Sequence, residues 1–270
     1  MTGLFPTFAQ AKATVDRSLR SNSGQHQSSA EQGLPLGSTT TLTAETAEAG
    51  MTIGVLGAKG GCGATTIALN LAAALARNYG DAALIDANFQ SPDAAILLGR
   101  EPKHSLVELI ARHNEIDNDL LAACSAPLLE GQACGSCRLF SGPADGSGAR
   151  TTSLSHLAEC IDSLRDFGRY YVVDLPGHLD KHLVTMLDRL DYVLLVFEAT
   201  IPSVAGARRW LKIFAELDYP QNKIIPVLNR AGGQLKQVEA DLPSLLGRNY
   251  AKLPNAFIVS QNCASAGAPA

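Results

Sequence analysis

A short apolar segment, a glycine-rich turn and a helix-like run follow one another between Ile53 and Ala76, and this succession strongly constrains the fold. The turn reads Lys59-Gly60-Gly61-Cys62-Gly63-Ala64-Thr65-Thr66. Glycines let several backbone amides converge on one point, and the N-terminus of the following helix adds the positive end of its dipole. The sequence therefore predicts a phosphate-binding loop between a strand and a helix.

The loop departs from the common G-x-x-x-x-G-K-[ST] pattern at two positions. Ala58 stands at the first glycine position and Ala64 at the lysine position, whereas Lys59 stands at the front of the loop. The usual lysine stabilises charge on the β- and γ-phosphates, and losing such a contact typically costs about 2–4 kcal/mol of transition-state stabilisation. Because the backbone amides remain, we expect nucleotide binding with slow or absent hydrolysis.

Apolar runs of strand length alternate with helix-like stretches over the rest of the chain. The expected strands are 53–56, 82–85, 170–173, 192–197 and 224–228, and the expected helices are 65–76, 105–112, 154–164, 204–217 and 235–246. This alternation predicts an α/β fold with three layers, in which helices cover both faces of a mostly parallel twisted sheet. Ligands in such folds bind at the carboxyl ends of the strands.

The first 50 residues differ in composition from the rest. Segment 21–49 is rich in Ser, Thr, Gln, Gly and Ala, which is typical of a disordered linker. Ahead of it, apolar residues in 5–19 recur near helical spacing, so this segment is either a docking helix or a tail with incidental periodicity. We expect a disordered low-complexity tail over 1–50 and one nucleotide-binding domain over 51–270.

The composition narrows the possible functions. The 270 residues are 46% hydrophobic and carry a net charge of −4, which allows a sizeable core and argues against nucleic-acid binding. No apolar run reaches the length of a membrane-spanning helix, and the N-terminus lacks the pattern of a secretory signal. Six cysteines in a chain of this length do not form a disulfide scaffold, so we expect a cytoplasmic protein.

Two of the expected strands end in aspartate. Asp174 closes 170–173 in the Walker B arrangement, in which the carboxylate holds Mg²⁺ directly or through water. Asp86 closes 82–85, and Asn88 follows it two residues later. Each aspartate also has the simpler interpretation of a turn or cap residue. Asparagine can orient a water molecule but cannot accept its proton, which again predicts weak catalysis.

Asn229 and Arg230 follow the expected strand 224–228. A side-chain amide offers both a donor and an acceptor, which matches the edge of an adenine ring. The alternative is a turn-forming asparagine after a strand. Pro254 and Asn255 are further candidates for contact with the adenine ring.

These motifs together resemble the ParA/MinD superfamily of ATPases, whose deviant phosphate loop reads K-G-G-x-G-K-[ST]. The resemblance implies ATP and Mg²⁺ as cofactors and a homodimer formed through the nucleotide, in which Lys59 reaches the ATP of the partner subunit. The residues at the family's functional positions are Lys59, Asp86 and Asn88 as catalytic groups, Gly60, Gly61, Cys62, Gly63, Ala64, Thr65, Thr66, Asn229 and Arg230 as nucleotide-binding groups, and Thr65 and Asp174 as Mg²⁺ ligands. Two of them depart from the family's pattern, because Ala64 replaces its lysine and Asn88 its second aspartate.

Segments 57–66, 86–98 and 227–230 resemble the CpaE/TadZ group, which serves Flp/Tad-type pilus assembly, within a resemblance that spans about 51–255. It implies a protein that positions or assembles a pilus or secretion machine, binds proteins of that machine, and is recruited to the inner membrane or cell pole with only peripheral membrane contact. The alternatives are an active partitioning or positioning ATPase on DNA or membrane, a relative serving cellulose secretion or flagellar placement, and a scaffold without nucleotide.

Two further patterns have simple structural interpretations. Cys134 and Cys137 form a CxxC pair, but a zinc site needs four ligands and the sequence has no second such pair. Arg208, Arg209 and Lys212 give one expected helix a basic face, of the kind with which some ParA-type proteins bind DNA. Three charges on a helix are more often a solvated face.

Overall fold

The computed structural model describes residues 50–99, 104–128, 136–143, 152–232 and 236–254. The expected tail, Cys134 and Asn255 lie outside these residues.

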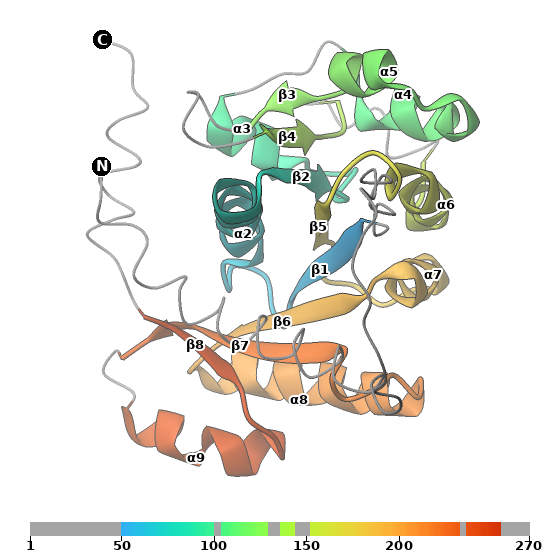
Figure 1. Cartoon of the computed structure of the whole chain (residues 1–270). Helices are drawn as coiled ribbons and strands as arrows, with labels where there is room; N and C mark the ends of the chain where they lie inside the picture. The colour runs from blue at the N-terminus through green and yellow to red at the C-terminus, as the bar shows by residue number, and fades with distance from the viewer. Residues whose placement is uncertain (1–49, 100–103, 129–135, 144–151, 233–235, 255–270) are drawn as a thin grey trace, which may run out of the picture.

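The described residues form a single eight-stranded sheet (Figure 1) with the strand order β3-β4-β2-β5-β1-β6-β7-β8. All neighbouring strands are parallel except β3 and β4, which pair antiparallel at one edge. The strands are β1 (Met51–Gly57), β2 (Asp81–Asp86), β3 (Ala126–Pro127), β4 (Ser136–Phe140), β5 (Tyr170–Leu175), β6 (Tyr192–Glu198), β7 (Ile224–Ala231) and β8 (Ala251–Pro254).

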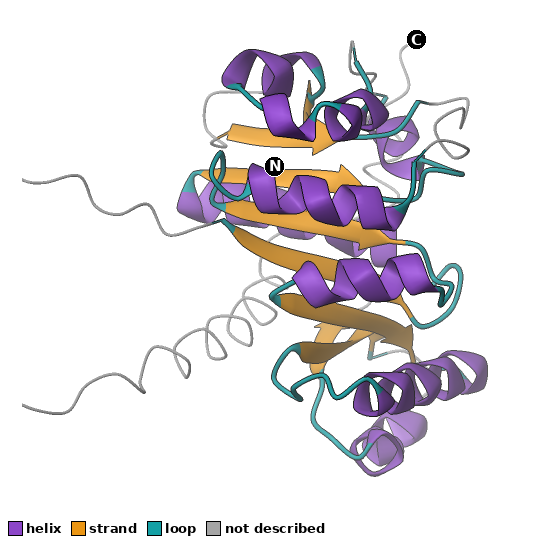
Figure 2. Ribbon diagram, turned by 90° about the vertical axis from the view of Figure 1, so that its right-hand side faces the viewer, coloured by secondary structure: helices purple, strands orange, loops and turns teal. Residues whose placement is uncertain are grey.

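Helices cover both faces of this sheet. They are α2 (Ala64–Tyr79), α3 (Asp93–Leu98), α4 (Leu106–Ala111), the 3₁₀ turn η1 (His113–Glu115), α5 (Asn118–Ala123), α6 (Leu154–Leu164), α7 (Lys181–Arg189), α8 (Ile201–Glu216) and α9 (Lys236–Leu246). The apolar sides of α2 and α3 pack with one face of the sheet, and those of α4 to α8 pack with the other. Figure 2 shows α6, α7 and α8 lying in front of the strands. This three-layer α/β arrangement confirms the predicted fold class.

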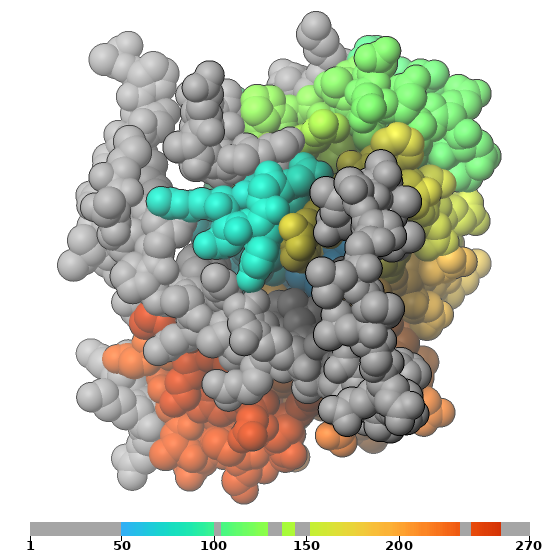
Figure 3. All heavy atoms as spheres, in the orientation of Figure 1, coloured from blue at the N-terminus to red at the C-terminus, as the bar shows by residue number. Residues whose placement is uncertain are grey.

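The burial of the strands explains why their sequences are apolar throughout. In β1, Ile53 and Val55 pack into the cluster beneath α2, whereas Leu56 packs into the cluster on the opposite face. Each side chain is no more than 1% exposed, because parallel strands in the centre of a sheet have helices on both sides. The space-filling view in Figure 3 shows the α4–α5 region and the β8–α9 region at opposite ends of the molecule, as the strand order requires.

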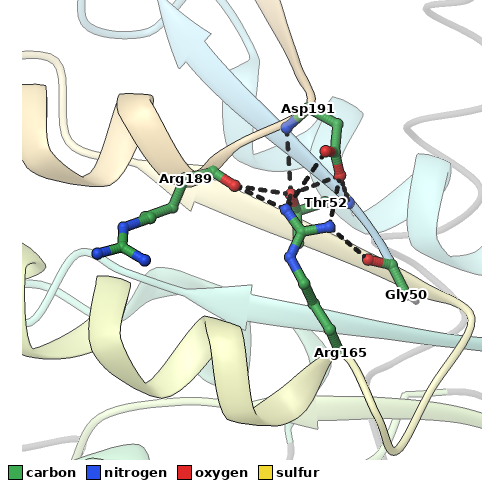
Figure 4. A network of polar contacts seen from close by, with 5 residues as sticks. All are labelled: Gly50, Thr52, Arg165, Arg189 and Asp191. Carbon is green, nitrogen blue, oxygen red and sulfur yellow. Dashed lines mark hydrogen bonds and ion pairs between the residues drawn. The ribbon is translucent and has the colours of Figure 1, made fainter.

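A polar network joins the amino-terminal ends of the neighbouring strands β1 and β6, whereas the phosphate loop lies at the carboxyl end of β1 (Figure 4). The Arg165 guanidinium, just after α6, donates to the carbonyl oxygens of Gly50 and Arg189, both at 2.7 Å, and to the Thr52 hydroxyl at 2.9 Å. It also forms an ion pair with Asp191 at 3.0 Å, and the Asp191 carboxylate accepts the backbone N–H of Thr52 at 2.7 Å. Thr52 is fully buried, so this network satisfies polar groups at the start of the central strand.

Among the described residues, the structure has no helix with both the length and the apolar character that crossing a membrane requires.

Candidate nucleotide site

The glycine-rich loop lies where the sequence places it, between the carboxyl end of β1 and the N-terminus of α2. Gly61 and Gly63 have φ angles of 79° and 90°, in the region that favours glycine. Gly63 is the N-cap of α2, and no side chain caps this 16-residue helix. The N–H groups of its first turn and its dipole can therefore act on an anion.

The outer rim of the loop is open. A Cβ atom built on Gly60 or Gly61 would meet no other atom within 4 Å, so the backbone here can be approached closely. Lys59 is exposed, and its ammonium donates to the carbonyl oxygen of its neighbour Gly60 at 3.0 Å. Ala64 is half-buried and Thr66 is exposed. Lys59 is thus at the surface, as its predicted reach to a partner requires, and its role in catalysis stays a prediction.

Strand β6 anchors the inner side of the loop. The backbone N–H of Ala58 donates to the carbonyl oxygen of Val196 at 2.8 Å, and the Cys62 thiol donates to the same oxygen at 3.4 Å. Cys62 is only 1% exposed, so its side chain is a loop anchor and only its backbone is available to a ligand. A Cβ on Gly206 of α8 would lie 2.3 Å from the carbonyl oxygen of Ala58. The sequence analysis missed Gly206, for which a glycine inside a helical pattern was the available signal.

Asn229, at the end of β7, also supports the loop. Its amide nitrogen donates to the carbonyl oxygen of Cys62 at 2.9 Å, and its amide oxygen accepts the backbone N–H of Arg230 at 2.9 Å. The amide nitrogen would lie 2.5 Å from a Cβ on Gly63, so Asn229 fills the space that glycine leaves. The Arg230 guanidinium forms an ion pair with Glu198 of β6. The predicted adenine contacts of both residues stay predictions.

The two predicted Mg²⁺ ligands lie together. The Thr65 hydroxyl at the start of α2 lies near the carboxylate of Asp174 on β5, close enough to influence its pKa. Asp174 is 5% exposed, and burial raises its pKa to about 7, with the nearby Asp86 carboxylate adding to the rise and Thr65 opposing it. Hydroxyl and carboxylate oxygens are the ligands that Mg²⁺ prefers, so these residues fit the ion. Bound there, Mg²⁺ would neutralise charge on the β- and γ-phosphates.

Asp86 lies beside Asp174 on the neighbouring strand, and the two residues are in register. One of its carboxylate oxygens accepts the backbone N–H of Asn88 at 3.1 Å, and the other accepts that of Ala94 in α3 at 3.0 Å. Burial raises its pKa to about 6, while these two bonds lower it. Asp86 therefore shapes the turn from β2 to α3. The catalytic roles predicted for Asp86 and for the half-buried Asn88 remain predictions.

The two remaining sequence patterns lie on β4 and α8, and only Cys137 of the CxxC pair is among the described residues. Cys137 is buried on β4, and no described group of three or more His, Cys, Asp or Glu side chains is arranged to hold a metal ion. On α8, Arg208 and Arg209 are exposed, and Lys212 forms an ion pair with Glu216 at 3.6 Å. These contacts are those of a solvated helix face.

Comparisons with known proteins agree with this geometry. The model of the CobQ/CobB/MinD/ParA nucleotide binding domain matches residues 53–260. The septum site-determining protein MinD of Synechocystis is 24% identical over 186 residues, which are 68% of this chain and 66% of that protein. An uncharacterized ATP-binding protein of Methanocaldococcus jannaschii, MJ0547, is 27% identical over 164 residues, which are 60% of this chain and 57% of that protein. The chain thus matches less than two thirds of the length of either relative.

Solved structures with the same fold include a ParA family ATPase from Chlorobium tepidum, with a TM-score of 0.72 and 24% identity over 81% of this chain and 90% of that one. The cell division ATPase MinD of Pyrococcus furiosus has a TM-score of 0.63 and 21% identity over 80% of this chain and 88% of that one. At these identities the likeness concerns the fold.

Proposed function

Because the chain belongs to the family of CobQ/CobB/MinD/ParA nucleotide-binding domains, we propose that it binds ATP with Mg²⁺ between β1 and α2 and dimerises through the bound nucleotide. The observation that carries this proposal is the proximity of the Thr65 hydroxyl to the buried carboxylate of Asp174 at the uncapped N-terminus of α2. The phosphates would contact the loop backbone from Gly60 to Thr66, and Lys59 would reach the nucleotide of the partner subunit.

Hydrolysis in this proposal is slow or absent. Ala64 supplies no ammonium to the β- and γ-phosphates, and Asn88 cannot take a proton from water at neutral pH. Each loss removes transition-state stabilisation while leaving the backbone amides that hold the ground state. The protein would therefore act as a switch between a nucleotide-bound dimer and a monomer.

Titration calorimetry with ATP and with ADP, each with Mg²⁺, tests the binding part of the proposal. We expect micromolar affinity, and we expect Asp174→Ala to remove the dependence on Mg²⁺ while the protein still folds. Asp119→Ala is the matched control, because this exposed aspartate lies on α5, outside the phosphate loop. Absence of binding at millimolar nucleotide would contradict the proposal and leave a scaffold that works through its surface alone.

We further propose that the chain is a CpaE/TadZ-like protein that positions or assembles a Flp/Tad-type pilus or secretion machine. The support is the sequence resemblance over 57–66, 86–98 and 227–230, together with the small residue at the lysine position. Residues 51–270 would form the nucleotide-binding domain, and residues 1–50 would form a disordered low-complexity tail. Proteins of the machine would recruit the chain to the inner membrane or cell pole. Deletion of the gene should abolish pili or secretion, and the Lys59→Ala variant should fail to restore them.

An active positioning ATPase is the second candidate, and Asp86 is the observation that favours it. Its pKa of about 6 and its place beside Asp174 suit a group that takes a proton near neutral pH. Turnover that rises with DNA or lipid vesicles and disappears in Asp86→Ala would establish this candidate. Turnover unaffected by Asp86→Ala would exclude Asp86 as the base.

A further inference from the structure

A cleft of about 470 Å³ opens beside the candidate nucleotide site, and no residue of the phosphate loop lines it. Its walls come from the turn after β2, the first turn of α6 and the segment from the end of β5 into α7. Asn88 and Pro176 lie on its rim, two residues after Asp86 and Asp174 respectively. Its volume falls in the range of about 300–1,000 Å³ that is typical of small-molecule sites.

Three of the six histidines of the chain line this cleft, and they come from three different places. His156 lies in the first turn of α6, His178 in the segment after β5, and His182 in the first turn of α7. The Ser155 hydroxyl lies 2.9 Å from Nδ1 of His182, which fixes that ring and leaves its Nε2 for other contacts. Thr152 adds a further hydroxyl to the same walls.

The polar groups of the cleft favour a negative ligand. Its one carboxylate is Asp180, which caps α7 by accepting the backbone N–H of Leu183 at 2.8 Å and pairs with His178 at 3.6 Å. Its acceptor oxygens are thus engaged, whereas His156, Nε2 of His182 and the Thr152 hydroxyl can donate to a ligand. The N-cap of α6, Ser153, makes no side-chain hydrogen bond to that helix, so the backbone N–H groups of its first turn add to the donors.

The cleft also has an apolar part. Phe89 and Leu154 line it, and both are at least nine-tenths buried, so they offer a fixed wall to a ligand. We propose that this cleft is a second binding site, which takes a small organic anion with a carboxylate or phosphate group on a partly apolar body. Because Asn88 lies on its rim, the bound anion would sit next to the nucleotide site without using the phosphate loop.

Histidine ring signals in NMR spectra of the full chain test this proposal directly. The probes are citrate and inorganic phosphate, added at constant pH and ionic strength, with glycerol as the uncharged control. We expect saturable shifts of the His156, His178 and His182 signals with one or both anions and none with glycerol. His104 and His113 lie outside the cleft, and their signals should not move. Equal shifts at all five histidines, or shifts that never saturate, would overturn the proposal.

Variants separate this cleft from the phosphate loop, which also has room for an anion. His182→Gln should weaken binding of the anionic probe by about tenfold or more, because a hydrogen bond to a charged ligand is lost. His104→Gln is the matched control, because this exposed residue pairs with Glu108 and does not line the cleft. ATP affinity should stay the same in both variants, so the nucleotide proposal is tested separately. Anion binding that survives in His182→Gln and in His156→Gln would place the probe elsewhere and refute the second site.

Discussion

Replacement of Gly63 by alanine should damage the phosphate loop in two separable ways. The φ angle of 90° puts a non-glycine residue in the left-handed region, which costs about 1–2 kcal/mol. The new Cβ would also lie 2.5 Å from the amide nitrogen of Asn229 and displace it from the carbonyl oxygen of Cys62. Losing that hydrogen bond costs about 0.5–1.5 kcal/mol more. We therefore expect Gly63→Ala to lower the free energy of unfolding by about 2–3 kcal/mol.

A double-mutant cycle with Asn229 tests the second of these effects. Asn229→Ala removes the side chain with which the new Cβ collides, so Gly63→Ala in that background should cost only the backbone strain. We expect the double variant to be more stable than the sum of the single variants predicts by about 1 kcal/mol.

Urea unfolding followed by circular dichroism gives the four free energies, and titration calorimetry gives the matching ATP affinities. Gly60→Ala is the control in the same loop, because a Cβ there meets nothing within 4 Å, and its effect should stay within about 0.5 kcal/mol. Additive effects of Gly63→Ala and Asn229→Ala would refute the contact between these side chains. A cost of Gly60→Ala equal to that of Gly63→Ala would refute the explanation from backbone geometry.

Three other perturbations have expected outcomes. Arg165→Ala leaves Asp191 without its guanidinium partner and should lower the free energy of unfolding by about 2–3 kcal/mol in urea titrations; no change would mean that water replaces the network. Ala64→Lys should raise ATP hydrolysis by about tenfold or more, measured as phosphate release, and unchanged turnover would argue against the missing lysine as the cause. Burial raises the folded-state pKa of Asp86 to about 6 and of Asp174 to about 7 from 3.8, so the folded state binds more protons. Thermal stability of the nucleotide-free protein should therefore decrease as the pH rises from about 4 to about 7, and Asp174→Asn should make that decrease smaller.

Continuous apolar runs made the central strands predictable, since a strand buried on both faces needs such a sequence. Strand β8 was missed because only Ala251 and Leu253 of its four residues are buried. Helix α7 was missed although its buried residues Leu183, Met186 and Leu187 recur at helical spacing, because its nine residues make fewer than three turns. Short edge strands depend on tertiary packing, which local periodicity does not record.

The candidate site, like the fold, was predictable only in part. Residue types at fixed spacing placed Thr65 at the start of a helix and Asp174 at the end of a strand, and the structure brings the two close together. The support of the loop by Asn229 was not predicted, because its partner Cys62 is 167 positions away in the chain. The cleft with three histidines was not predicted either, since no local sequence pattern joins His156 to His178 and His182.

Light scattering of the purified chain with Mg-ATP and with Mg-ADP tests the central claim most directly. The proposed switch predicts a mass of 28.4 kDa with ADP and twice that mass with ATP. In Lys59→Ala the ATP-dependent dimer should be lost, whereas Lys212→Ala, on the solvated face of α8, should still dimerise. A mass of 28.4 kDa under every condition, at ATP concentrations that calorimetry shows to be saturating, would contradict the claim that nucleotide drives assembly.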